Sequence, residues 1–168
     1  MTMKVKVAMT STAVAVLAVL ATVMITASTY GLTEVVFAQV PKFVINLTGS
    51  EEVPPVQTEA TGVIGISLMP DSVGYSINAT NIDGVTAGHV HLGKKGENGP
   101  VVATLFKYDS PINEVSENGT ITADKLEGPM AGKQLSDYLT AGAAGMLYIN
   151  IHTERNPNGE IRGQSGAN

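Results

Sequence analysis

Short segments in which apolar and polar residues alternate run through most of this chain from residue 40 onward. KFVINLTG, GVIGISLM and SVGYSINAT are three of them, and glycine, proline and asparagine are frequent in the connections. Side chains of a β-strand point alternately to its two faces, so this pattern is typical of strands with one buried face. The chain is therefore expected to fold from short strands rather than from alternating strands and helices.

About seven or eight such strands, spaced about ten residues apart, indicate an all-β protein. We expect an antiparallel Greek-key sandwich or barrel, immunoglobulin-like or superoxide-dismutase-like, with one short helix. The helix is expected within residues 131–145, AGKQLSDYLTAGAAG. There Leu135, Tyr138 and Leu139 have the spacing of one helical face, and a glycine follows.

Two Asn-Gly pairs are expected to mark turns. Asn118-Gly119 should precede a strand, and Asn158-Gly159 should close a hairpin between LYINIHT and EIRGQ. The segment EEVPPVQTEA, residues 51–60, contains two consecutive prolines and is expected to be a loop or extended arm outside the sheet. The carboxylates at its start are expected to be solvated.

The first 38 residues have the pattern of an export segment. Lys4 and Lys6 precede an uncharged apolar run from about Val7 to Ala27, and a small-x-small site ends at Ala38. Because the apolar run is long enough to span a bilayer, both a cleaved signal peptide and a retained N-terminal membrane anchor stay open. Either way residues 39–168 are expected to form a single extracytoplasmic or secreted domain.

Charge and composition narrow the expected partners. Residues 39–168 contain eight basic and fourteen acidic residues, a net charge of −6, which disfavours binding to nucleic acid. The chain has no cysteine, so the core must stabilise the fold without disulfides. Asn46, Asn78 and Asn118 each begin a sequon that a host with the machinery can glycosylate.

The chain has three histidines, His89 and His91 in AGHVHLG and His152 in LYINIHT. Alternation places all three on the faces of their strands opposite the apolar residues. If the two strands are neighbours, the imidazoles share one surface and can converge on a metal ion at about 2.0–2.1 Å. With no thiolate in the chain, copper or zinc is the ion expected there.

The same pattern is compatible with histidines that only occupy half-exposed strand faces. Glu52, Glu154 and Glu160 are candidates for a carboxylate ligand, but their distance from the histidines is not encoded in the pattern. Glu160 and Arg162 are expected to pair around the hairpin, with a positioning role beside His152 as the alternative. The chain has no Gly-x-Ser-x-Gly motif, no phosphate-binding glycine loop and no cysteine nucleophile.

Three segments together resemble the chordin-type (CHRD) domain family. They are LTGSEEVPPV, GHVHLGKKGENGPVVATL and LYINIHTERNPNGEIRGQ, in the family's order, and the resemblance extends from about residue 43 to 165. It implies an exported β domain and carries no catalytic residue with it. The HVH segment also looks like the metal-binding strand of copper–zinc superoxide dismutases. Those enzymes have further histidines, an aspartate ligand and a disulfide, so the resemblance does not extend to their activity.

Two functions are compatible with these observations. The first is a non-enzymatic module at the cell surface or outside the cell that binds a protein or glycan partner. The second is an extracytoplasmic copper- or zinc-binding protein that uses His89, His91 and His152. In both, contact with a membrane is expected only through the N-terminal segment, if it is retained.

Overall fold

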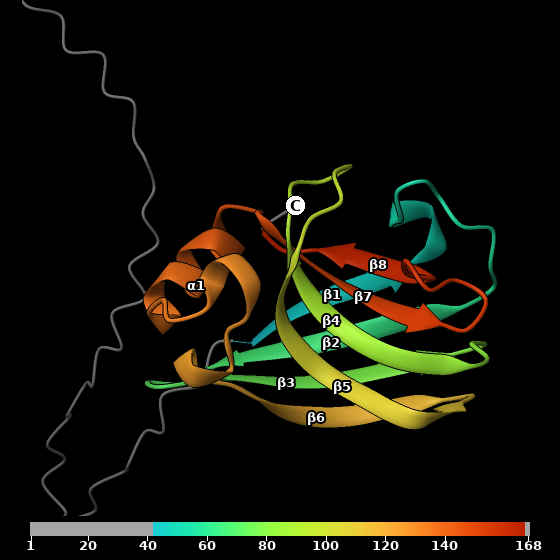
Figure 1. Ribbon diagram of the computed structural model, residues 1–168, viewed down its shortest axis with the longest axis horizontal. Helices are drawn as coiled ribbons and strands as arrows, with labels where there is room; N and C mark the ends of the chain where they lie inside the picture. Colours follow the sequence, from blue (N-terminus) through green and yellow to red (C-terminus); the bar gives the residue numbers. More distant parts are fainter. Residues whose placement is uncertain (1–41, 167–168) are drawn as a thin grey trace, which may run out of the picture. The chain divides into compact units, whose positions relative to one another are not determined.

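The computed structural model describes residues 42–166 (Figure 1). The expected signal peptide or anchor, residues 1–38, and its cleavage site lie outside the described residues. Within the described part, no helix is both long enough and apolar enough to cross a membrane.

Eight antiparallel strands form one strongly curved sheet in the order β5-β4-β7-β8-β1-β2-β3-β6. Strands β1, β2 and β3 form an antiparallel meander. Beyond it, β3 pairs with β6, and β4 pairs with β7. The strands are β1 (Lys42–Thr48), β2 (Thr61–Leu68), β3 (Val73–Thr80), β4 (Val85–Leu92), β5 (Val101–Ile112), β6 (Val115–Ile121), β7 (Leu147–Thr153) and β8 (Ile161–Gln164).

The sheet is a nearly closed barrel. β5 and β6, the two ends of the strand order, are joined by the short connection at residues 113–114 and lie side by side in Figure 1. Because β7 returns to lie beside β4, the strands β4 to β7 make a Greek-key crossover. The expected all-β Greek-key fold is confirmed in its barrel form.

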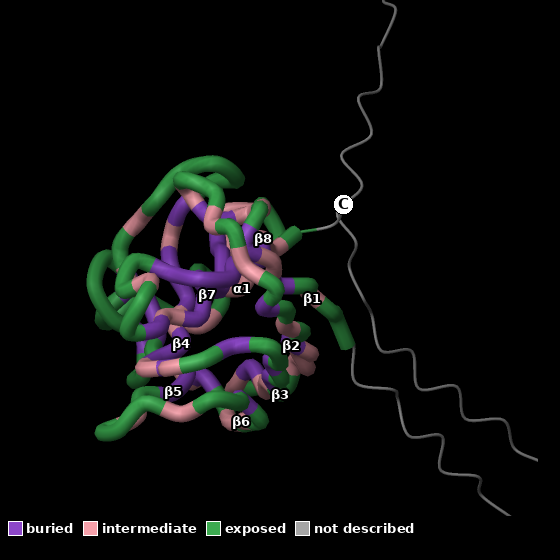
Figure 2. Tube along the Cα trace, turned by 90° about the vertical axis from the view of Figure 1, so that its right-hand side faces the viewer, coloured by how far each residue is buried: buried purple, intermediate pink, exposed green. Residues whose placement is uncertain are grey.

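The inward faces of the strands build the core. At least one apolar residue of every strand is almost fully buried there, and Figure 2 shows such buried segments on β4, β5 and β7. The alternation seen in the sequence predicts these positions correctly at the strand centres, whereas Phe43, at the start of β1, is 52% exposed. The core residues with the least exposure include Leu47, Ile64, Val73, Ile77, Val85, Val90, Val102, Ile121, Ile151 and Ile161.

The expected helix is confirmed as α1, Leu135–Ala143, which lies beside one end of the barrel (Figure 1). Its first turn has a reciprocal capping box, in which the Gln134 side chain accepts from the Asp137 backbone N–H and the Asp137 carboxylate accepts from the Gln134 N–H. Tyr138 is buried against the core, with Leu135 and Leu139 packed beside it. Gly145, at a φ of +68°, allows the chain to turn back into β7.

The expected turn at Asn118-Gly119 is wrong. Both residues lie inside β6, opposite Ser76 and Tyr75 of β3. A side chain at position 119 would collide with the ring of Tyr75, whose hydroxyl donates a hydrogen bond to the Leu105 carbonyl. Glycine is therefore placed here by cross-strand packing rather than by a turn.

The other two local expectations are confirmed. Residues 154–160 connect β7 to β8, and Gly159 has a φ of +126°. Residues 52–60 run outside the sheet between β1 and β2, after the 3-10 turn η1 (Gly49–Glu51). Two further 3-10 turns, η2 (Ala123–Lys125) and η3 (Gly128–Met130), lead from β6 towards α1.

Candidate functional site: a three-histidine cluster on the outer face of the barrel

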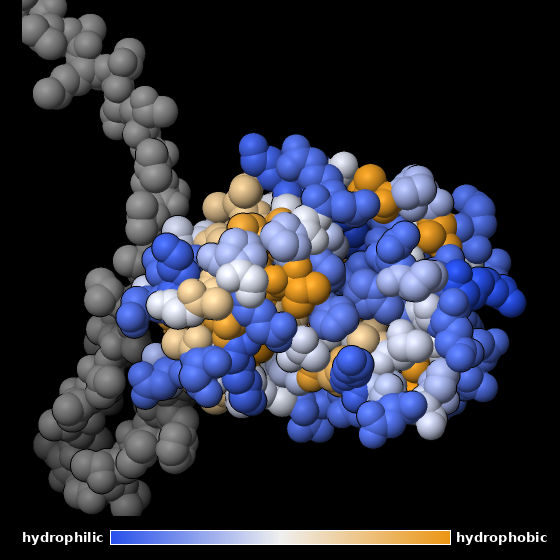
Figure 3. All heavy atoms as spheres, in the orientation of Figure 1, coloured by the Kyte–Doolittle hydropathy of each residue, from blue (hydrophilic) through white to orange (hydrophobic). Residues whose placement is uncertain are grey.

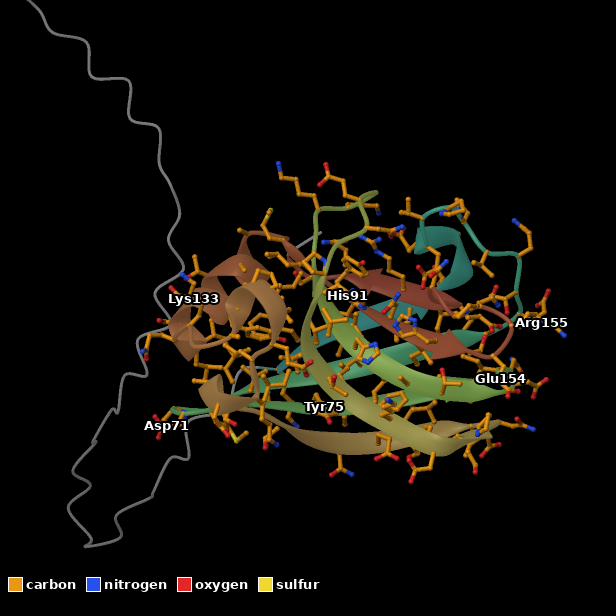
Figure 4. The ribbon with its side chains drawn as sticks, in the orientation of Figure 1. Asp71, Tyr75, His91, Lys133, Glu154 and Arg155 are labelled. Atoms are coloured by element: carbon orange, nitrogen blue, oxygen red, sulfur yellow. The ribbon has the colours of Figure 1, made fainter. Side chains whose placement is uncertain are left out.

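All three histidines lie on the outward face of the neighbouring strands β4 and β7. The register pairs His89 with Asn150, His91 with Tyr148, and Ala87 with His152. His152 is therefore the diagonal neighbour of His89 across the strand pair. Figure 4 labels His91 on β4, close to the loop that leads to β5. The structure brings together the three residues that alternation placed on one kind of face.

One ring nitrogen from each histidine lies within 4.8 Å of the other two. The ring centroids of His89 and His152 are 4.8 Å apart, and each is 5.8 Å from the centroid of His91. Bonds of about 2.0–2.1 Å to one ion require nitrogens about 3.3–3.6 Å apart. Small side-chain rotations would close the remaining gap of about 1 Å, since ring rotations cost little.

Two of the histidines are held in one tautomer by backbone carbonyls. His91 Nδ1 lies 2.9 Å from the Gly99 oxygen and His152 Nδ1 lies 3.0 Å from the Pro157 oxygen. A carbonyl only accepts, so each Nδ1 carries the proton and each Nε2 is left with a lone pair. Carbonyl partners of this kind orient histidines that ligate metals.

Three of the remaining ring nitrogens are buried and have no hydrogen-bond partner among the described residues. These are His89 Nδ1, His91 Nε2 and His152 Nε2, each with less than 1 Å² of solvent-accessible surface. Buried polar atoms are almost always paired, so three unpaired nitrogens in one cluster need a physical explanation. A bound cation would supply one, because it accepts all three lone pairs at once.

Burial keeps these imidazoles neutral. Burial, together with the positive charges that His152 and His91 would carry, lowers the pKa of His89 to about 4, while Glu127 acts in the opposite direction. Burial also lowers the pKa values of His91 and His152, against the effect of their carbonyl partners. Neutral imidazole is the form that binds metal, so the cluster is ready for ligation at neutral pH.

Arg162 holds the loop that contains the Gly99 carbonyl. Its Nη2 donates to the carbonyls of Lys94 and Glu97 at 3.1 and 3.0 Å, and its Nη1 lies 3.3 Å from Asn98 Oδ1. The side chain is only 1% exposed although it is charged. A buried guanidinium that satisfies loop carbonyls fixes the loop on the sheet.

Aromatic packing connects Arg162 to the cluster. The rings of His91 and Tyr148 are stacked, with centroids 4.8 Å apart and planes 9° apart. The Arg162 guanidinium lies 3.5 Å above the centroid of the Tyr148 ring. The Tyr148 ring, held between His91 and Arg162, thus limits the positions that the His91 ring can adopt.

Glu160 organises the turn that carries the Pro157 carbonyl. Its carboxylate accepts hydrogen bonds from Thr58, Thr153 and Asn156 at 2.7, 2.7 and 3.0 Å. Burial favours a raised pKa for Glu160, but these bonds outweigh it and the pKa is lowered. The turn is thereby fixed next to His152.

The expected ion pair between Glu160 and Arg162 is wrong. Glu160 is occupied by hydroxyl and amide donors, and Arg162 by loop carbonyls, the Asn98 and Gln164 side chains and an aromatic ring. The single salt bridge among the described residues joins Lys95 to Glu51 at 3.0 Å. Each of the two residues instead supports a different histidine through a different loop.

None of the candidate glutamates joins the three ring nitrogens in the ligand cluster. Glu52, expected to be solvated, is in fact 4% exposed and lies beside Asn150 and Gly159. Burial raises the pKa of Glu52 to about 7, although Arg162 and a hydrogen bond from Asn150 lower it. Glu160 is used by the turn, and Glu154 is exposed.

Neither the exposed polar residues nor the surface clefts mark the position of the three histidines. Hydrophilic residues cover the loop between β4 and β5 in Figure 3, where residues 94–98 are exposed. A polar cleft of about 610 Å³ is lined by residues that include Asn81, Asp83 and Arg155, and a smaller one by Glu52 and residues 155–159. None of the three histidines lines either cleft.

The sequence pattern missed the residues that support the histidines. Alternation placed Tyr148 and Asn150 on the histidine face, but their contacts depend on the register with β4 and β8. The roles of Arg162, Gly99 and Pro157 depend on loops folding back over the sheet. The only local signal was the alternation of Arg162 and Gln164 with Ile161 and Gly163 in β8, which places both polar side chains on the face opposite Ile161.

The fold and the cluster define a small antiparallel β domain with a histidine site on its outer surface. The model of the CHRD domain family matches residues 43–165, most of the described chain. The chain belongs to the CHRD domain family. CHRD domains are typically extracellular and the family is not known as enzymatic. No curated protein and no solved structure matches the chain.

Proposed function

We propose that this CHRD domain is an extracytoplasmic copper- or zinc-binding protein whose ligands are His89, His91 and His152. The observation that carries the proposal is the set of three unpaired, buried ring nitrogens within 4.8 Å of one another. Two of the three rings have their tautomer set by a backbone carbonyl. That arrangement is the one expected of a prepared imidazole site.

The ligand chemistry favours copper or zinc over harder ions. Imidazole nitrogen suits both metals, whereas calcium and magnesium prefer oxygen ligands, and no carboxylate belongs to the cluster. The proposal includes a non-enzymatic role outside the cytoplasm, supported by the family's usual location. A bound ion would also stabilise the fold, because it binds the native arrangement only.

Calorimetric titration of the purified, untagged protein with Zn²⁺ and Cu²⁺ tests the proposal. We expect one ion per chain at micromolar affinity or tighter, and loss of binding in the triple variant His89→Ala, His91→Ala, His152→Ala. Because the chain has no other histidine, loss of binding in this variant assigns the site to these three residues alone. Equal, weak binding of Zn²⁺, of Cu²⁺ and, without oxygen, of Cu(I) by both proteins would overturn the proposal.

A matched control separates ligation from charge. Glu154→Gln removes an exposed carboxylate from the turn beside His152, and Glu154 is not one of the proposed ligands. We expect it to bind as the parent protein does. Binding of a protein or glycan partner, the other function that the sequence favours, stays a prediction.

A further inference from the structure

We infer that the three-histidine site is selective for a monovalent d¹⁰ ion, Cu(I), over Zn²⁺ and Cu²⁺. This inference rests on the proposed function and specifies its ligand. The observations that carry it are the lack of solvent access to the ligand nitrogens, the ligand charge and the charges around the site.

The first observation concerns coordination number. All three unpaired nitrogens expose less than 1 Å² to solvent, and the two clefts on the surface are lined by other residues. Zinc in protein sites takes four ligands, with a water completing a three-histidine set. His89 and His152 are half-buried, but the rings cover the three nitrogens themselves, so the cluster offers no solvent-facing position for that water. Cu(I) is stable with three ligands in a plane, so it needs no further one.

The second observation concerns charge. The cluster contains three imidazoles and no carboxylate, so the ligands provide no negative charge. A divalent ion would keep its full double charge in a partly desolvated site, and the desolvation cost rises with the square of the charge. A monovalent ion carries a quarter of that cost and gains the same three nitrogen contacts.

The surrounding charges act in the same direction. Arg162 is buried behind Tyr148 and His91. Lys107 lies opposite Ala87 in the β4–β5 register, and Ala87 lies opposite His152, but Lys107 is exposed and therefore screened by solvent. Glu127 is the acidic residue that acts on His89, and it is exposed to solvent, which screens it. Glu52, which acts on Arg162, is 4% exposed, and burial raises its pKa to about 7, so it is only partly ionised at neutral pH. The site therefore has little negative charge to offset a divalent ion.

The experiment is a competition measurement on the purified, untagged protein without oxygen. Cu(I), kept reduced with ascorbate, is partitioned between the protein and a chromophoric Cu(I) chelator of known affinity. Zn²⁺ and Cu²⁺ are partitioned in parallel against their own chelators. We expect Cu(I) to bind at least ~100-fold tighter than either divalent ion, a difference of about 2.8 kcal/mol. X-ray absorption of the Cu(I) form should show three nitrogen neighbours and no fourth ligand.

Two variants at one position test the charge argument directly. Because the buried, unpaired nitrogen of His89 is Nδ1, the side-chain oxygen of Asp or Asn reaches nearly the same point. His89→Asn keeps the ligand neutral and should retain the preference for Cu(I) at lower affinity. His89→Asp adds a negative charge and should move the preference towards Zn²⁺ by at least ~10-fold relative to His89→Asn.

The outcomes separate this inference from the proposed function. Stoichiometric binding of Zn²⁺ or Cu²⁺ at the histidines, as tight as that of Cu(I) or tighter, would leave the metal-binding function in place and overturn the selectivity. Failure of all three ions to bind would overturn both. If His89→Asp does not fold, the parent protein and His89→Asn still decide the question.

Discussion

The inner face of the β4–β7 strand pair is buried and so is much of its outer face, where His89 and His152 are half-buried, but the two faces are built from different chemistry. The inner face presents Val90, Ile149 and Ile151, with exposures of 1%, 3% and 0%. The outer face presents His91, Tyr148 and Asn150, with exposures of 8%, 2% and 1%, and lies under the loop before β5 and the segment after β1. An aliphatic face needs only close packing, whereas a polar face needs a partner for every donor and acceptor.

This difference determines which residues each face depends on. The inner face depends on neighbours within the barrel, and any apolar side chain of the right volume satisfies it. The outer face depends on loop carbonyls and on Arg162, which holds them. The buried side-chain nitrogen and oxygen atoms that lack a hydrogen-bond partner among the described residues all lie on this outer side. They belong to the three histidines, Glu52 and Asn150. We therefore expect substitutions on the inner face to affect stability, and substitutions on the outer face to affect metal binding as well.

The largest expected effect is on the inner face. Ile151→Ala should lower the free energy of unfolding by about 2–5 kcal/mol, because it leaves a cavity at a fully buried position. Urea denaturation of the metal-free protein measures this loss. The metal affinity of the folded fraction should not change. Ile151→Val should lower the free energy of unfolding by about 1 kcal/mol. A change in metal affinity that is larger in Ile151→Ala than in Ile151→Val would show that the two faces are not independent.

The second effect is expected at the loop anchor. Arg162→Met keeps the apolar stem of the side chain but leaves the carbonyls of Lys94 and Glu97 unpaired. We expect the free energy of unfolding to fall by about 2 kcal/mol and the metal affinity to fall by about 10–100-fold. Arg162→Lys, which can restore one of these bonds, should lie between the variant and the parent.

Ile151→Val is the matched control for Arg162→Met. Both variants lose stability, but only Arg162→Met should lose metal affinity, because Arg162, unlike Ile151, anchors the loop whose Gly99 carbonyl orients His91. Equal affinities in the two variants would mean that the loop is not needed to position the histidine.

The sequence predicted the inner face better than the outer one. The alternation of Leu147, Ile149 and Ile151 is a local pattern, so it predicted both the strand and its buried side. It also placed the three histidines on one kind of face, although nothing local determined that β4 and β7 would pair. The burial of the outer face depends on contacts such as the one between Arg162 and Glu97, which are 65 residues apart. Asn118-Gly119 was misassigned for the same reason, since Tyr75 lies on another strand.

The third effect depends on pH and concerns Glu52. Its pKa is raised from 4.5 to about 7 in the fold, so the folded protein binds more protons than the unfolded chain between these values. Stability from this group is therefore fully present below pH 4.5 and is lost as the pH rises to about 7. Glu52→Gln imitates the protonated form. Its stability relative to the parent should rise by on the order of 2 kcal/mol between pH 4.5 and 8.

Comparison of the metal-free parent and Glu52→Gln at each pH cancels the histidines, whose lowered pKa values act in the opposite direction below pH 6.5. A difference in unfolding free energy that stays constant from pH 4.5 to 8 would mean that the pKa of Glu52 is not raised by folding, so that Glu52 is ionised at neutral pH. It would then provide the negative charge beside Arg162 that the selectivity for Cu(I) excludes.

The smallest effect is expected at the outermost contact of the same loop. Lys95 and Glu51 form a salt bridge at 3.0 Å, but the Lys95 side chain is 70% exposed. Exposed pairs of this kind contribute about 0–1 kcal/mol, and salt screens them. Lys95→Gln should therefore change the free energy of unfolding by less than about 0.5 kcal/mol and leave the metal affinity unchanged. Because Lys95 and Arg162 attach the same loop to the rest of the molecule, the pair of variants tests whether burial decides which contact matters. A loss of affinity in Lys95→Gln as large as that in Arg162→Met would place the control of His91 at the surface of the loop instead of beneath it.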